Sequence, residues 1–272
     1  MSFFKKFIDK FHYLSFDVAI GAWIQALAIQ KFTQYLFPSD YFILLVPTTL
    51  IIYWLDRILD VYKLNNKTIL TAKHRLYKNY FYIILTATLL LGSIVIIKGL
   101  FFSDITVQKM GVYGSFSVGV YFFIHHVFKG KPQLIFFKEL MIAIIYSLIL
   151  WILPLIYSFS LLNFLGFLCL FFHALLNLWI ISLWEKDLDN QMNTHSFAQF
   201  IGIEKFIHVL FIITLINCGL LMYWDSYFGL TNFFMLQGHF ILFRAKECSF
   251  RRIWMEFIFW IPLLYVLLPN YR

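Results

Sequence analysis

Trp184-Glu185-Lys186-Asp187-Leu188-Asp189-Asn190 follows directly on an apolar run from Leu161 to Leu183. Three carboxylates at the end of so apolar a segment need an explanation. On a helix, Glu185 and Asp189 would share one face, with side chains about 5–6 Å apart. Such a pair can hold a divalent cation between its oxygens. The segment therefore predicts a helix that ends in an acidic, cation-binding turn.

The composition places this segment in a membrane protein. The chain has 272 residues, of which 61% are hydrophobic and 13% charged, and its mean hydropathy is +0.78. A soluble domain of this size carries about 25% charged residues. Since no polar stretch is long enough for a soluble domain, residues 1–272 are predicted to form a single membrane-embedded domain. Residues 1–14 are basic and amphipathic, which predicts a helix lying on the membrane face.

A spanning helix needs about 20 mostly apolar residues, and this length predicts an all-α bundle of nine membrane spans. The predicted spans are residues 15–37, 40–56, 79–99, 110–128, 136–157, 161–184, 203–224, 227–243 and 253–269. Of the 22 Lys and Arg residues, 18 then lie on the side of the N-terminus and 4 on the other. This asymmetry predicts a cytoplasmic N-terminus. The net charge of +8 thus reports topology, and no nucleic-acid partner is expected.

A second acidic pair, Asp56 and Asp60, ends the second predicted span with the same spacing. The second and sixth spans run in the same direction, so both pairs are expected at the cytoplasmic face, each followed by a polar loop. Carboxylates ringed by Lys and Arg suit magnesium and a diphosphate. A prenyl diphosphate would place its charged head there and its hydrocarbon tail between the spans.

The cysteines and two of the histidines predict no site of their own. The cysteines Cys169, Cys218 and Cys248 have no paired spacing, so neither a disulfide nor a zinc site is expected. His173 and His208 fall within predicted spans. Haem ligation and hydrogen-bonded packing are both open to them, and packing is the commoner role.

The motif Glu185-x-Asp187-x-Asp189-x-x-x-Asn193-x-x-Ser196-x-x-x-x-x-Gly202 resembles the second aspartate-rich motif of the UbiA-type membrane prenyltransferases. That motif reads D-x-E-x-D-x-x-x-G-x-x-[ST] and is followed by a glycine in the next helix. Three positions match the spacing, namely Asp189, Ser196 and Gly202. The other three carry substitutions, namely Glu185, Asp187 and Asn193.

Two further segments resemble the same family. Asp56 and Asp60 match the second half of its first motif, N-D-x-x-D-x-x-x-D, whereas Ile52 and Tyr53 stand at the Asn-Asp positions. The segment Tyr121-x-x-x-His125-His126, followed by Pro132-Gln133-Leu134, is similar to the family's Y-x-x-x-K-R and P-Q-L, with histidines in place of the basic pair.

The resemblance implies Mg²⁺-dependent transfer of a prenyl group from a prenyl diphosphate to an aromatic or other lipophilic acceptor within the lipid bilayer. The implied metal ligands are Asp56, Asp60, Glu185 and Asp189, and the implied catalytic carboxylates are Asp56, Asp60, Asp187 and Asp189. The implied substrate contacts are Arg75, His125, His126, Lys129, Lys131 and Ser196. We expect a multi-pass protein of a bacterial inner membrane with cytoplasmic active-site loops.

Two other classes of protein stay open. The missing Asn-Asp favours a non-catalytic relative that acts as a lipid-binding or assembly subunit. A small transporter is a third class, but it predicts ionisable residues near the middle of the membrane, and those of this chain cluster at the span ends.

Overall fold

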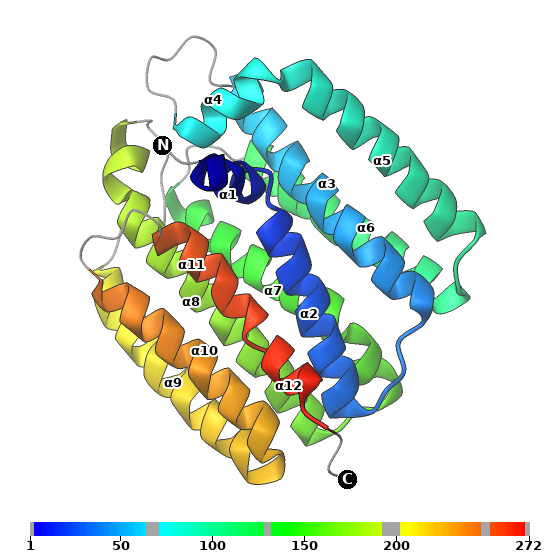
Figure 1. The fold of residues 1–272 in the computed structure, drawn as a ribbon, viewed down its shortest axis with the longest axis vertical. Coiled ribbons are helices and arrows are strands. Elements are labelled where there is room, and N and C mark those ends of the chain that lie inside the picture. The colour runs from blue at the N-terminus through cyan, green and yellow to red at the C-terminus, as the bar shows by residue number, and fades with distance from the viewer. Residues whose placement is uncertain (1–2, 64–70, 128–131, 192–201, 246–250, 270–272) are drawn as a thin grey trace. The chain divides into compact units, whose positions relative to one another are not determined.

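The structure is a computed structural model, and it describes residues 3–63, 71–127, 132–191, 202–245 and 251–269. Within these ranges all regular secondary structure is helical (Figure 1), which confirms the all-α fold class. The chain divides into two compact units. The first unit comprises residues 1–23 and 37–112, and the second comprises residues 24–36 and 113–272.

The helices begin and end close to the predicted spans. Their bounds are α1 (Phe3–Tyr13), α2 (Phe16–Thr33), α3 (Ser39–Lys63), α4 (Ala72–Asn79), α5 (Phe81–Phe101), α6 (Ile105–Val127), α7 (Pro132–Tyr157), α8 (Leu161–Gln191), α9 (Ile203–Trp224), α10 (Ser226–Arg244), α11 (Arg251–Phe257), the 3₁₀ helix η2 (Ile258–Trp260) and α12 (Leu263–Leu267). Each predicted span therefore contains helix. The predicted amphipathic segment 1–14 corresponds to α1.

Among the described residues, five helices are long and apolar enough to cross a membrane, and a sixth candidate arises if the bent pair α1–α2 counts as one span. The five segments are Ser39–Tyr62, Phe81–Phe101, Lys138–Tyr157, Leu161–Asp187 and Ile203–Trp224. On α5, apolar side chains such as Ile83, Leu89 and Ile94 are exposed. A helix that presents apolar side chains outward suits contact with lipid. These helices are compatible with a multi-pass membrane protein, and the count of nine stays a prediction.

The first unit begins with a sharp corner between α1 and α2, which are bent by 69°. Ser15 adopts a positive φ of 60° at this corner. His12 Nδ1 lies 2.5 Å from Asp17 Oδ2 across it, and both side chains are buried. Trp54 Nε1 of α3 donates to the carbonyl of Leu14 at 2.9 Å. These contacts attach the amphipathic helix to the first long apolar helix of its own unit.

Helices α3, α4 and α5, together with the start of α6, form the rest of the first unit. At one end of α3 a small core joins Ile58, Tyr77 and Ile84. At the other end, Asp40 accepts a hydrogen bond from Lys98 Nζ of α5 at 2.8 Å and another from the Asp104 amide at 3.2 Å. Each end of α3 is therefore fixed by a different kind of contact.

The second unit contains helices packed as neighbours, α7 on α8, α8 on α9, and α9 on α10 (Figure 1). Two glycines allow close approach. A Cβ on Gly166 would lie 2.3 Å from the ring of Trp151, and a Cβ on Gly229 would lie 2.3 Å from the backbone nitrogen of Met222. Small residues at such crossings are typical of helices that associate in membranes.

The last predicted span is broken in the structure. Pro262 has no N–H, so the carbonyl of Ile258 receives no bond from it, and the Ile261 amide bonds to that carbonyl instead at 3.1 Å. The result is a short 3₁₀ turn between α11 and α12. Lys31 Nζ of α2 donates to the carbonyls of Tyr265, Val266 and Leu268, which lie at the end of α12.

Candidate functional site

The first predicted carboxylate pair lies near the end of α3, with an arginine between its members. Arg57 Nη1 donates to Asp60 Oδ2 at 3.1 Å, and Arg57 Nη2 lies 3.9 Å from Asp56 Oδ2. The side chains of Asp56, Arg57 and Asp60 keep 17%, 23% and 23% of their exposure. The three charges, which we call the α3 set, are thus half-buried and in contact.

Helix α4 carries one residue that interacts with the α3 set, Tyr77, and one predicted substrate contact, Arg75. The Tyr77 side chain is buried, packs against Ile58, and is close enough to Arg57 and Asp56 to feel their charges. Burial raises the pKa of Tyr77, Arg57 lowers it by a smaller amount, and Asp56 raises it further. Arg75, a predicted diphosphate contact, is exposed on the same helix. The hydroxyl of Tyr77 makes no hydrogen bond to the described residues.

The second predicted carboxylate group lies at the end of α8 and is also in contact with arginine. Glu185 accepts a hydrogen bond from Arg252 Nη1 of α11, and both side chains are about one-third exposed, at 32% and 35%. The guanidinium of Arg251 lies 4.7 Å from the ring centroid of Trp184. Asp187 is exposed. We call Glu185, Asp187 and Asp189 the α8 set.

The other predicted residues are described only in part. Asp189 lies within α8, and His125 and His126 lie in the last turn of α6, but the side chains of all three are outside the described part. The predicted contacts Lys129, Lys131 and Ser196 fall in the ranges 128–131 and 192–201, outside the described residues. Gly202, which ends the predicted motif, is the N-cap of α9.

A further carboxylate near the α8 set was not predicted. Glu139 of α7 is buried and accepts a hydrogen bond from the Ser182 hydroxyl of α8. Ser182 lies three residues before Glu185 on the same helix. The sequence places Glu139 near a span end, which gives no sign that the carboxylate turns inward.

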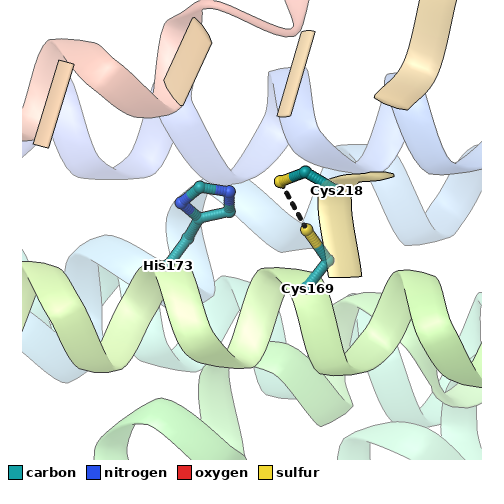
Figure 2. A group of neighbouring side chains, drawn as sticks. All are labelled: Cys169, His173 and Cys218. Atoms are coloured by element: carbon teal, nitrogen blue, oxygen red, sulfur yellow. Dashed lines mark hydrogen bonds between the residues drawn. The ribbon is translucent and has the colours of Figure 1, made fainter. Parts of the chain in front are cut away.

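The structure also joins two cysteines and a histidine that the sequence keeps apart. Cys169 and Cys218 have their sulfur atoms 3.9 Å apart, and both thiols are free. Figure 2 shows them beside the ring of His173. One ligand atom from each of the three residues lies within 4.8 Å of the other two. The spacing of the cysteines in the sequence did not indicate that this pair would meet. The available signal was the four-residue spacing of Cys169 and His173, which puts them on one helix face.

The two carboxylate sets have the donor chemistry of a magnesium site. Carboxylate oxygens are the protein ligands that Mg²⁺ uses most, commonly one or two per ion together with substrate phosphates and water. In the α3 set, two carboxylates and one guanidinium leave one net negative charge. The side chains of Asp56, Asp60 and Glu185 are partly exposed and so remain accessible to solvent.

No protein-family model matches the chain, and comparisons with curated proteins and with solved structures found no match either.

Proposed function

We propose that this chain is an intramembrane transferase that moves a prenyl group from a prenyl diphosphate to a lipophilic acceptor, as a divergent member of the UbiA-type prenyltransferases. The observation that carries the proposal is the α3 set, in which Asp56 and Asp60 lie four residues apart at the end of an apolar helix and contact one arginine. An aspartate pair beside a guanidinium can bind both parts of a magnesium diphosphate.

In the proposed reaction the bond between the allylic carbon and the diphosphate oxygen breaks. The bonding electrons leave with the diphosphate, and the acceptor supplies the electron pair for the new bond to carbon. The acceptor then loses a proton. Bound Mg²⁺ would neutralise part of the diphosphate charge. Asp56, Asp60, Glu185 and Asp189 are the proposed metal ligands, with Asp187 as a further carboxylate on α8.

Arginine has a defined part in this proposal. Arg57 binds Asp60 and Arg252 binds Glu185 in the structure. When a cation takes over the carboxylate oxygens, each guanidinium becomes available to donate to phosphate oxygens, a geometry that arginine matches with paired N–H groups. Arg75, His125, His126, Lys129, Lys131 and Ser196 are the further proposed substrate contacts. The substrate's hydrocarbon tail would lie among the apolar helices.

The direct test is magnesium-dependent binding of a non-hydrolysable prenyl diphosphate analogue by the purified full chain, followed by turnover with a panel of chain lengths. Asp56→Asn and Asp60→Asn are expected to lower analogue affinity by at least tenfold. Asp40→Asn is the matched control, because Asp40 lies on the same helix at its other end, paired with Lys98. The enzyme proposal fails if the wild-type chain neither binds nor turns over any member of the panel.

A non-catalytic membrane subunit is the second candidate, and a specific observation favours it. Arg57 and Arg252 already neutralise carboxylates that the first proposal assigns to magnesium. For such a subunit, the Arg57–Asp60 pair would stabilise the end of α3, and the Arg252–Glu185 pair would join α11 to α8. Stable co-purification with one membrane protein, together with unchanged behaviour of the Asp56→Asn variant, would support this candidate over the enzyme.

A further inference from the structure

A buried cluster of side chains of metal-binding types lies in the second unit. It includes none of the residues predicted as metal ligands or substrate contacts. Cys169 and His173 are four residues apart on α8, and Cys218 lies on α9, which packs against α8. Figure 2 shows Cys169 and His173 on one face of α8, with the Cys218 sulfur directed toward that of Cys169. All three side chains have 0% exposure.

The cluster contains polar atoms that packing alone does not satisfy. Neither ring nitrogen of His173 makes a hydrogen bond of ordinary geometry to the described residues, although the backbone of Asn232 lies close to the ring. Leaving a buried donor or acceptor unpaired is unfavourable. Cysteines at a helix crossing can serve as small apolar residues. That role gives the imidazole no partner, whereas a metal ion would.

A second histidine, on α10, lies beside the cluster and stacks on His173. The rings of His173 and His239 are stacked with centroids 5.4 Å apart. His239 Nδ1 lies 2.8 Å from the carbonyl of Met235, and a carbonyl only accepts, so the proton is on Nδ1. The Nε2 lone pair is therefore available, and Nε2 has no hydrogen-bond partner among the described residues. This is the tautomer in which histidine binds a metal through Nε2.

The sulfur separation fits metal ligation better than a disulfide. Two sulfurs at about 2.3 Å from one tetrahedral zinc ion lie about 3.8 Å apart, close to the 3.9 Å observed between Cys169 and Cys218. A disulfide requires sulfurs about 2.0 Å apart.

Charge selects the class of ion. An apolar interior strongly disfavours net charge. Two thiolates and neutral imidazoles balance a divalent cation and leave no net charge. A monovalent copper ion with the same ligands would leave one uncompensated negative charge. Among the abundant divalent ions, zinc is the one that prefers thiolate sulfur and imidazole nitrogen as ligands.

We propose that Cys169, His173 and Cys218 bind a structural zinc ion. His239 Nε2 is not among the ligand atoms that lie within 4.8 Å of one another, so it would have to move closer to supply a fourth ligand. Binding exchanges two thiol protons for two metal–sulfur bonds, and the protons leave to solvent. The ion would link α8 and α9. This inference does not depend on the proposed transferase function, because none of the four residues belongs to the α3 or α8 set.

The test begins with the wild-type chain. Purified without chelators, it is expected to contain about one zinc ion per chain by elemental mass spectrometry. After zinc removal under reducing conditions, Co²⁺ is expected to restore a thiolate-to-cobalt charge-transfer band and the strong visible bands of a tetrahedral site. Wild-type protein that holds no zinc and gives neither cobalt signal overturns the proposal, whatever the variants do.

Variants then assign the ligands. His173→Ala and the double change Cys169→Ala with Cys218→Ala are expected to weaken Co²⁺ binding by more than about 100-fold, since even residues beyond the ligands contribute 10–100-fold. His208→Ala is the matched histidine control, because His208 is exposed on α9 and bonded to the Glu204 carbonyl. Cys248→Ala is the cysteine control. Equal metal content in the ligand variants and the controls would overturn the assignment. A disulfide between Cys169 and Cys218 in the purified wild-type chain would overturn it as well.

Discussion

The approach of α9 to α10 at Gly229 gives a stability prediction whose size follows from the structure. A Cβ at this position would lie 2.3 Å from the Met222 nitrogen and 2.5 Å from its Cα, whereas ordinary Cβ contacts begin at 3.4 Å. Gly229→Ala must therefore move the two helices apart by about 1 Å to restore an ordinary contact. The obstacle is backbone, so rotation of a side chain does not relieve it.

The free-energy change combines two opposing effects. Overpacking in a tight interior costs about 1–3 kcal/mol, and a backbone clash belongs at the upper end of that range. Alanine gains about 0.5–1 kcal/mol over glycine within a helix. The expected net loss for Gly229→Ala is about 2 kcal/mol of unfolding free energy.

Gly219 supplies the matched control on α9. A Cβ at Gly219 meets nothing within 4 Å, so Gly219→Ala is expected to retain or raise stability by up to about 1 kcal/mol. The measurement is equilibrium unfolding of both variants in mixed detergent micelles, followed by tryptophan fluorescence. The packing inference is refuted if Gly229→Ala unfolds at the same denaturant concentration as Gly219→Ala.

Three further outcomes follow from polar contacts. Lys31→Met removes the charged donor from three carbonyls near the end of α12. A loss of about 1.5–3 kcal/mol of unfolding free energy is expected in the same measurement. A variant as stable as the wild type would show that these hydrogen bonds do not stabilise the fold. Asp225→Ala removes the N-cap contact to the Phe228 amide and the acceptor for Tyr265 Oη. The expected loss of unfolding free energy is about 1–2 kcal/mol, and no loss would mean that solvent replaces both contacts. Tyr77→Phe should retain stability at neutral pH. Burial raises the pKa of Tyr77 above its ordinary 10.0, so as the pH rises the phenol ionises first in the unfolded chain. Ionisation of Tyr77 therefore leaves the free energy of unfolding of the wild type unchanged below pH 10.0 and lowers it as the pH rises further. The variant should therefore lose less stability than wild type in alkaline buffer, and equal losses would argue against a buried hydroxyl.

The helices were largely predictable because apolar length and helix length coincide in such a chain. The predicted span 203–224 has the bounds of α9, and α10 differs from 227–243 by one residue at each end. The prediction ended the sixth span at residue 184, but α8 continues to Gln191. A helix need not stop where its apolar run stops, because polar residues continue the same backbone hydrogen bonding.

The side-chain partners were not predictable, since they depend on which helix faces meet. Spacing alone placed Asp56 and Asp60 together, but nothing in the sequence indicated that Arg252 would bind Glu185, 67 residues earlier. Cys169 and Cys218 are 49 residues apart and meet only because α8 packs on α9. Local periodicity determines which residues share a face, and contacts between faces need the tertiary structure.

The bonds from Lys31 to the carbonyls near residue 265 have a consequence for synthesis in the cell. Lys31 and Tyr265 are separated by 234 residues of chain. At about 5–20 residues per second, the ribosome needs roughly 12–50 s to make that interval. Lys31 must therefore wait without its carbonyl acceptors near residue 265 while most of the protein is translated. This interval is when an insertase or chaperone could bind α2, and slower elongation would lengthen it.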